Sequence, residues 1–149
     1  MKRKALGIML FLAILTGFFG CNQRTTETLA IQAIEVTVID EDTARFVSYG
    51  PDEHIIASVD DDYSQNITTV LGLLQSHYTV YCQGSDGNPD DTCSFSGTYG
   101  FYVMGIDELT AFGARQYIGF YIDGVYAMSG IGDTDIEVGK TYRFLIETY

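Results

Sequence analysis

Alternating apolar and polar residues near the start of the polar part of the chain predict a β-hairpin. Residues 34–39 place isoleucine or valine at every second position, with glutamate and threonine between them. This period of two is typical of a strand with one buried face. Residues 44–49 are a second candidate strand, which Gly50 and Pro51 interrupt. We therefore expect two paired strands here, and residues 54–59 are a candidate for a short third strand.

A helix is predicted for residues 64–77, where the apolar spacing changes from two to three or four. Ser64 or Asn66 supplies a side-chain oxygen that can cap its first turn. His77 would lie at the C-terminal end, where the helix dipole favours a cation, and this explains the residue better than catalysis does. The apolar stripe of the helix consists of Ile67, Val70, Leu71, Leu74 and Tyr78.

Short aromatic segments separated by turn residues follow the helix and are predicted to be strands. The dipeptide Asp123-Gly124, between two of these segments, is a strong signal for a type I′ hairpin. The predicted strands cover residues 79–83, 99–106, 117–122, 125–128 and 142–148. A hairpin, one helix and then several strands indicate an α+β domain in which one helix packs on a mixed sheet.

One face of the predicted strand at residues 117–122 is the candidate ligand surface. Alternation directs Ile118, Phe120 and Ile122 inward and leaves two tyrosines around Gly119 outward. Glycine allows a flat ligand or a backbone to approach closely, and tyrosine offers apolar area with a polar tip. Packing of tyrosines across strands is the equally favoured alternative. The candidate binding residues are Tyr99, Phe101, Gln116, Tyr117, Gly119, Tyr121 and Tyr126.

The first 20 residues have the composition of a bacterial lipoprotein signal peptide. Three basic residues follow Met1, and residues 5–20 carry no charge, as in the basic and apolar regions of a secretory signal. The uncharged segment is shorter than the roughly 20 residues that span a bilayer as a helix. Its ending, Gly20-Cys21, resembles a lipobox, in which the cysteine is lipidated after cleavage. An ordinary cleaved signal or an uncleaved anchor, with an incidental Cys21, is the alternative.

This interpretation divides the chain into a signal peptide at 1–20, a lipidated Cys21 with a polar tether at 21–32, and one domain at 33–149. The predicted location is extracytoplasmic, with the protein anchored to the bacterial cell membrane through its lipid. Outside the cytoplasm, Cys82 and Cys93 are predicted to form a disulfide. Two buried free thiols are the alternative.

The charge balance excludes several classes of partner. Once the basic residues of the signal are removed, five lysine and arginine residues remain against 20 aspartate and glutamate residues. Nucleic acids and anionic lipid surfaces are bound by cationic surfaces, so we expect neither as a ligand. No nucleophile–base set or paired acid motif indicates an enzyme, and no cofactor is predicted.

Two acidic clusters have residue types found in calcium sites but lack the spacing. The three aspartates at residues 60–62 are either a cation site or, as we expect, a solvated loop before the helix. Asp86, Asn88 and Asp90 alternate as at the start of a calcium loop, but positions six and twelve lack the required glycine and glutamate. The sequence therefore predicts no metal site.

Four segments together resemble the transcobalamin C-terminal-like family, a domain of bacterial surface proteins. They are TTVLGLL at residues 68–74, YGFYVMGID at 99–107, QYIGFYIDGVYA at 116–127 and DIEVGKT at 135–141. The resemblance implies a β-grasp-like fold, with one helix across a mixed sheet. It also makes cobalamin a candidate ligand, because the same module forms the smaller domain of the animal cobalamin carriers. One small domain covers only one face of a corrinoid, so binding is expected to be weak or shared with a partner.

Two functional hypotheses follow. In the first, a membrane-anchored cell-surface lipoprotein binds a small molecule, a corrinoid or a carbohydrate, and serves its uptake with a transporter. In the second, the domain is a protein–protein interaction or adhesion module of the cell envelope and has no small ligand.

Overall fold

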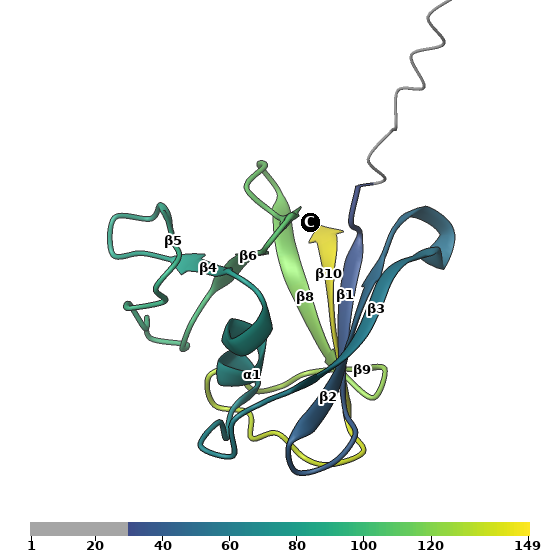
Figure 1. Ribbon diagram of the computed structural model, residues 1–149. Coiled ribbons are helices and arrows are strands. Elements are labelled where there is room, and N and C mark those ends of the chain that lie inside the picture. The colour runs from purple at the N-terminus through teal and green to yellow at the C-terminus, as the bar shows by residue number, and fades with distance from the viewer. Residues whose placement is uncertain (1–29) are drawn as a thin grey trace, which may run out of the picture.

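The computed structural model describes residues 30–149, which form two β-sheets and one short helix (Figure 1). The predicted signal peptide, lipidated Cys21 and most of the tether lie outside the described residues. The α+β class is confirmed. The expected mixed sheet is wrong, because every pairing between the described strands is antiparallel. At the centre of the large sheet, the last strand of the chain runs antiparallel to the first.

The large sheet has six strands in the order β3-β2-β1-β10-β8-β9. The C-terminal strand β10 lies between β1 and β8, so the first and last strands of the described chain are neighbours at the centre of the sheet. A single turn of 3-10 helix, η1 (Pro51–Glu53), separates β2 from β3. The strands are β1 (Ala33–Val38), β2 (Thr43–Tyr49), β3 (Ile55–Asp62), β8 (Gln116–Ile122), β9 (Val125–Tyr126) and β10 (Thr141–Thr148).

The small sheet has four short strands in the order β5-β4-β6-β7. They are β4 (Val80–Gln83), β5 (Pro89–Asp90), β6 (Val103–Ile106) and β7 (Leu109–Thr110). The predicted strand at residues 99–106 is wrong in its first half, because Gly97 and Gly100 pair with each other in a tight turn. The Asp123-Gly124 hairpin is confirmed, and both of its residues have positive φ as a type I′ turn requires. Its second strand ends earlier than predicted, at Tyr126.

The helix α1 (Val70–His77) begins later than the sequence indicates. Its N-cap is Thr69, whose hydroxyl oxygen accepts a hydrogen bond of 3.2 Å from the Gly72 amide. Ser64 instead forms a turn, in which its hydroxyl oxygen accepts from the Asn66 amide at 3.3 Å. Serine and asparagine stabilise such turns as readily as helix starts, which is why the predicted cap at Ser64 or Asn66 is wrong.

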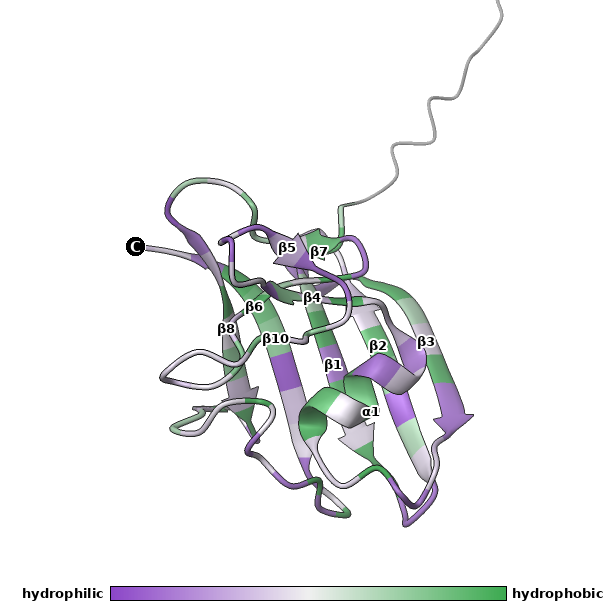
Figure 2. Ribbon diagram, turned by 90° about the vertical axis from the view of Figure 1, so that its left-hand side faces the viewer, coloured by the Kyte–Doolittle hydropathy of each residue, from purple (hydrophilic) through white to green (hydrophobic). Residues whose placement is uncertain are grey.

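The core fills the space between the large sheet and a second layer made of α1 and the small sheet, which lie on the same side (Figure 2). The Phe120 and Phe144 rings stack with centroids 5.1 Å apart. The inward direction of Ile118, Phe120 and Ile122 is confirmed, since all three pack in this cluster. The opposite side of the large sheet, here called the outer face, is left uncovered by this second layer.

Candidate functional site on the outer face of the large sheet

The outer face carries the polar and aromatic side chains that alternate with core residues along each strand. The register of β8 and β10 places Tyr117 opposite Glu147 and Tyr121 opposite Arg143. Gly119 lies between the two tyrosines. The tyrosines therefore face away from the core, as the sequence pattern predicts.

Glu147 occupies the space above Gly119. A β-carbon at residue 119 would lie 2.6 Å from Glu147 Oε2 and 3.1 Å from Cε2 of Tyr121, so a larger residue would displace the carboxylate. The Tyr121 hydroxyl donates a hydrogen bond to Glu147 Oε1, and Tyr117 lies directly opposite Glu147 on the neighbouring strand. The gap that the sequence assigns to a flat ligand is thus filled by a side chain of the same protein.

Glu147 also changes the titration of both phenols. Its hydrogen bond, followed by desolvation and its negative charge, raises the pKa of Tyr117 to about 12. The same causes in the same order raise the pKa of Tyr121. A neutral phenol donates to the carboxylate, whereas a tyrosinate would be repelled by it. At neutral pH both phenols are therefore protonated, and the Tyr121 hydroxyl, which donates to Glu147, offers its oxygen lone pairs to the surroundings.

Three more tyrosines surround this pair. The Tyr126 and Tyr121 rings meet edge to face with centroids 5.4 Å apart, and the centroids of the Tyr149 and Tyr117 rings are 6.1 Å apart. Burial raises the pKa of Tyr102, and the nearby phenols of Tyr149 and Tyr126 add to the shift. The five tyrosines 102, 117, 121, 126 and 149, together with Glu147, are called the tyrosine cluster below.

The structure divides the seven predicted binding residues into separate groups. Tyr117, Tyr121 and Tyr126 belong to the tyrosine cluster, and Gly119 lies beneath its carboxylate. Tyr99 and Phe101 instead line a hollow of about 290 Å³ in the segment before β6. Tyr102 lines the same hollow and so connects it to the tyrosine cluster.

Two of the predicted residues have structural surroundings of their own. Phe101 packs on the hydrophobic core, and one edge of its ring would lie 2.6 Å from a β-carbon at Gly132. Gln116, at the start of β8, lies over Gly113, where its Oε1 would be 2.6 Å from a β-carbon. These contacts fix the two side chains away from the tyrosine cluster.

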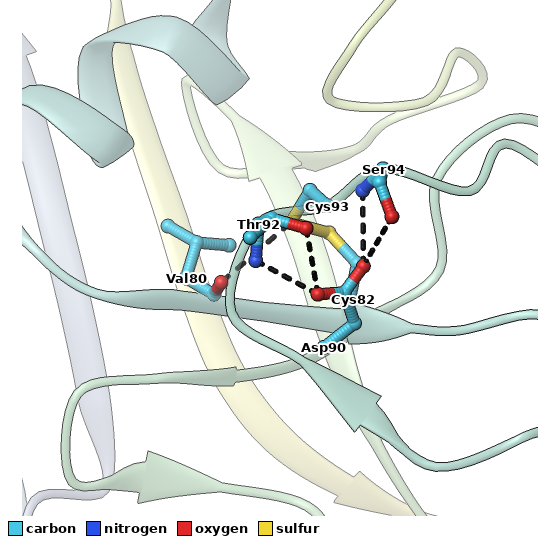
Figure 3. Close-up of a disulfide and its surroundings, with 6 residues drawn as sticks. All are labelled: Val80, Cys82, Asp90, Thr92, Cys93 and Ser94. Atoms are coloured by element: carbon cyan, nitrogen blue, oxygen red, sulfur yellow. Dashed lines mark hydrogen bonds between the residues drawn. A yellow bond between two sulfur atoms is a disulfide. The ribbon is translucent and has the colours of Figure 1, made fainter.

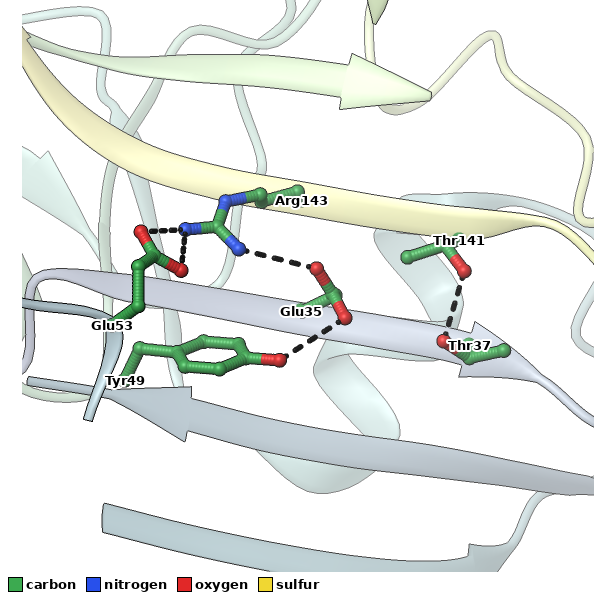
Figure 4. Close-up of polar contacts among 6 residues, drawn as sticks. All are labelled: Glu35, Thr37, Tyr49, Glu53, Thr141 and Arg143. Carbon is green, nitrogen blue, oxygen red and sulfur yellow. Dashed lines mark hydrogen bonds and ion pairs between the residues drawn. The ribbon is translucent and has the colours of Figure 1, made fainter. Parts of the chain in front are cut away.

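Arg143 is the centre of a second polar group on the outer face (Figure 4). Its Nη2 donates to both carboxylate oxygens of Glu53, at 2.6 and 2.7 Å, and its Nη1 donates to Glu35 at 3.3 Å. The guanidinium carbon lies 5.0 Å from the centre of the Tyr49 ring, whose hydroxyl also donates to Glu35. Since two carboxylates neutralise this cation, an anionic ligand would have to displace one of them.

The disulfide between Cys82 and Cys93 is present and joins β4 to the loop after β5 (Figure 3). Beside it, the Asp90 carboxylate accepts hydrogen bonds from the amides and hydroxyls of both Ser94 and Thr92. These bonds, with the Ser94 hydroxyl contributing most, lower the pKa of Asp90. Asp90 therefore holds the loop in shape and has its oxygens occupied by the chain itself.

The aspartates at residues 60–62 lie in β3, so the predicted loop at this position is wrong. Asp60 forms a two-fold hydrogen bond with Arg45, at 2.7 and 2.9 Å. Asp61 Oδ2 lies 3.1 Å from Nδ1 of His77, at the end of α1. The imidazole in turn stacks on Phe46 with ring centroids 4.0 Å apart. These partners, 15 and 16 residues away, extend the strand beyond what the local sequence indicates.

Within residues 30–149, no group of three or more histidine, cysteine, aspartate or glutamate side chains is placed to hold a metal ion. The same range contains no helix with the length and apolar character needed to cross a membrane. Comparison with family models, with curated proteins and with solved structures finds no match for this chain. The resemblance to the transcobalamin C-terminal-like family therefore stays a prediction.

Sequence reasoning missed Glu147, Tyr102 and Tyr149 as parts of the site. Glu147 has a signal, because it alternates with the inward residues of the last predicted strand. That signal becomes useful only once β10 is known to pair with β8, which sets Glu147 opposite Tyr117. Tyr149 is one residue beyond β10, and nothing local indicates that it returns to the tyrosine cluster.

Proposed function

We propose that this chain is a membrane-anchored lipoprotein of the cell surface whose domain binds a small polar molecule at the tyrosine cluster. The observation that carries the proposal is an uncovered group of five tyrosines around one carboxylate. Tyr102, Tyr126 and Tyr149 are 48%, 53% and 78% exposed, so their rings are accessible. Lipid on Cys21 would keep this surface at the membrane, close to a transporter that takes up the ligand.

A carbohydrate fits the chemistry of the tyrosine cluster. Exposed tyrosine rings offer apolar faces to the C–H side of a sugar ring. Because the Tyr121 hydroxyl donates to Glu147, its free lone pairs accept hydrogen bonds from sugar hydroxyls. The surrounding negative charge, with four cationic against 19 acidic residues in the described range, favours neutral ligands over anionic ones.

A corrinoid is the second ligand of this class, and the family resemblance supports it. An uncovered sheet face contacts only one side of so large a ring, whereas tight sites bury most of the ligand surface. The expected affinity is therefore low, unless a partner protein covers the other side. The β-grasp-like fold that accompanies this resemblance stays a proposal as well.

Titration of the full-length chain in detergent micelles with neutral oligosaccharides and with cyanocobalamin tests the proposal. We expect saturable binding that Tyr126→Ala weakens at least about tenfold, equivalent to about 1.4 kcal/mol. Val125→Ala, on the other side of the same strand and 71% exposed, is the matched control and should leave binding unchanged. No binding of any of these ligands at millimolar concentration would overturn the proposal.

A protein–protein interaction or adhesion module without a small ligand is the second candidate. A different observation favours it, namely the exposed edge strand β3, whose eight residues are all accessible. Its contact surface would lie at the opposite edge of the large sheet from β8 and β9, so the two functions are tested independently.

A further inference from the structure

The strand β3 forms an open edge of the large sheet. It is the outermost strand on one side of the sheet, and all eight of its residues are exposed. Three of them are large and apolar, since Ile55, Ile56 and Val59 are 55%, 39% and 45% exposed. Long exposed edges of this kind template pairing with another chain unless they are protected.

The register identifies which peptide groups of β3 are free. Residue pairs in an antiparallel ladder exchange hydrogen bonds alternately, and the Tyr63 amide donates to the Asp42 carbonyl at 2.7 Å. The pairs that continue this alternation join β3 to β2 through Ala57, Val59 and Asp61. The peptide groups of Ser58, Asp60 and Asp62 therefore point away from the sheet.

The acidic end of β3 is only partly protected against pairing. The Asp62 amide is occupied by the carboxylate of Asp61, at 3.0 Å, which removes one outward donor. Ser58 and Asp60 keep their outward amide and carbonyl groups, which gives an added strand a short ladder. Arg45 offsets the charge of Asp60, so the net negative charge at this end comes from Asp61 and Asp62. This charge repels acidic segments and attracts basic ones.

A hollow of about 760 Å³ beside the edge provides room for side chains of an added strand. It lies on the outer face, and its lining includes Val47 and Tyr49 of β2 as well as Ile55 and Ser58 of β3. An apolar side chain of the added strand would pack on Ile55, which is 55% exposed. The edge thus has an apolar half at Ile55–Val59 and an acidic half at residues 60–62.

We propose that the free edge of β3 binds an extended segment of another polypeptide as an additional strand. This partner segment carries valine or isoleucine opposite the apolar half and lysine or arginine opposite the acidic half. Strand addition of this kind takes affinity from main-chain hydrogen bonds and specificity from alternate side chains. A second copy of this chain is the less favourable occupant, because a surface with four cationic against 19 acidic residues repels itself. The proposal deepens the protein-interaction candidate, on which it rests, and does not depend on ligand binding at the tyrosine cluster.

The test uses the full-length, isotope-labelled chain in detergent micelles and a synthetic nine-residue peptide. The peptide is acetylated and amidated, alternates valine with threonine, and carries three lysines at one end. We expect saturable binding below about 1 mM and at least tenfold slower hydrogen exchange at the Ser58 and Asp60 amides. A peptide with glutamate in place of lysine should bind at least tenfold more weakly, and equal binding overturns the proposed charge selection.

Two variants of Ser58 separate backbone pairing from side-chain contact. Ser58→Pro removes the outward amide, and edge strands tolerate proline where the amide faces solvent, so peptide binding should be lost. Ser58→Ala keeps the amide and should bind like the unmodified chain. If Ser58→Pro fails to fold, peptides with N-methyl groups on alternate amides make the same test on the unmodified protein, because only one of the two methylation phases should abolish binding.

Three results would overturn the proposal. They are equal binding by Ser58→Pro and Ser58→Ala in folded protein, unchanged exchange at Ser58 and Asp60, and equal binding by both N-methylated peptides. Slower exchange at these amides with rising protein concentration, in the absence of peptide, would identify a second copy as the occupant instead. Tyr126→Ala should leave peptide binding unchanged, so failure here is distinguishable from failure of the small-ligand proposal.

Discussion

The two faces of the large sheet are made from alternate residues of the same strands, yet different forces hold them. On the inner face, Phe144 is fully buried and stacks on Phe120. On the outer face, the neighbouring residue Arg143 binds two carboxylates and Glu147 accepts from the Tyr121 phenol. On the inner face, folding removes apolar surface from water, and this is the main driving force of folding. The outer face keeps charged groups that contribute little stability in exposed pairs.

This fold therefore separates its buried apolar side chains from its exposed polar ones by strand alternation alone. Substitutions on the inner face should change the free energy of unfolding. Substitutions on the outer face should change titration and binding, and should lower the free energy of unfolding by about 1 kcal/mol or less. Four predictions test this separation.

The largest effect is expected from adjacent residues of β10 that face opposite sides. Phe144→Ala should lower the free energy of unfolding by about 3–5 kcal/mol, because it leaves a cavity in the core. Leu145→Ala, on the half-buried outer side, should lower it by about 1 kcal/mol. Urea denaturation followed by circular dichroism measures both, and equal losses would contradict the separation of the two faces.

The disulfide should have the next largest effect on the free energy of unfolding. It lies in the second layer, with the small sheet. Cys82 and Cys93 are 0% and 6% exposed and are 11 residues apart in the sequence. Replacing both by serine should lower the free energy of unfolding by about 3 kcal/mol, since the loop they close is no longer constrained in the unfolded chain. Reduction of the unmodified protein is the matched measurement, and a loss below about 1 kcal/mol in both would contradict the prediction.

The smallest effect on stability, with a clear spectroscopic signature, is expected for Glu147→Gln. Removing the charge should bring the pKa of Tyr117 down from about 12 towards the ordinary value of about 10. The ultraviolet absorbance of tyrosinate, recorded as a function of pH, measures this change in pKa. Glu108→Gln, in the exposed β6–β7 turn, removes the same charge elsewhere and should leave this titration unchanged.

The same shift predicts how stability depends on pH. A phenol whose pKa is raised in the folded state contributes stability below the pKa of the unfolded chain, about 10, and loses it as the pH rises. For Tyr117 the loss should run from about pH 10 to the folded pKa of about 12. Denaturation midpoints should therefore fall over this range in the unmodified protein and fall less in Glu147→Gln.

The fold was predictable where the signal is local. The alternation in β1 and the Asp123-Gly124 turn depend on neighbouring residues, and the structure contains both. The end of β3 was not predictable, because Asp60 and Asp61 are held by Arg45 and His77 from other elements. The antiparallel centre of the sheet depends on the pairing of β1 with β10 at opposite ends of the domain, which no local pattern records.

The candidate site divides in the same way. The outward direction of Tyr117 and Tyr121 follows from strand alternation. The use of the space above Gly119 does not, because Glu147 reaches it from 26 residues beyond Tyr121. The sequence predicts one strand over residues 99–106 and so places Tyr99 and Phe101 on the same surface. The strand in the structure, β6, begins only at Val103.

The central position of β1 has a mechanical consequence. This strand is the first of the described chain and pairs along its length with β2 on one side and β10 on the other. A pull applied at residue 30 therefore acts along the strand axis and loads both ladders in shear, so that many hydrogen bonds resist together. A partner held at β3 would receive the force through β2 in the same way. The hydrogen bonds of each ladder would then resist the force together rather than break one after another.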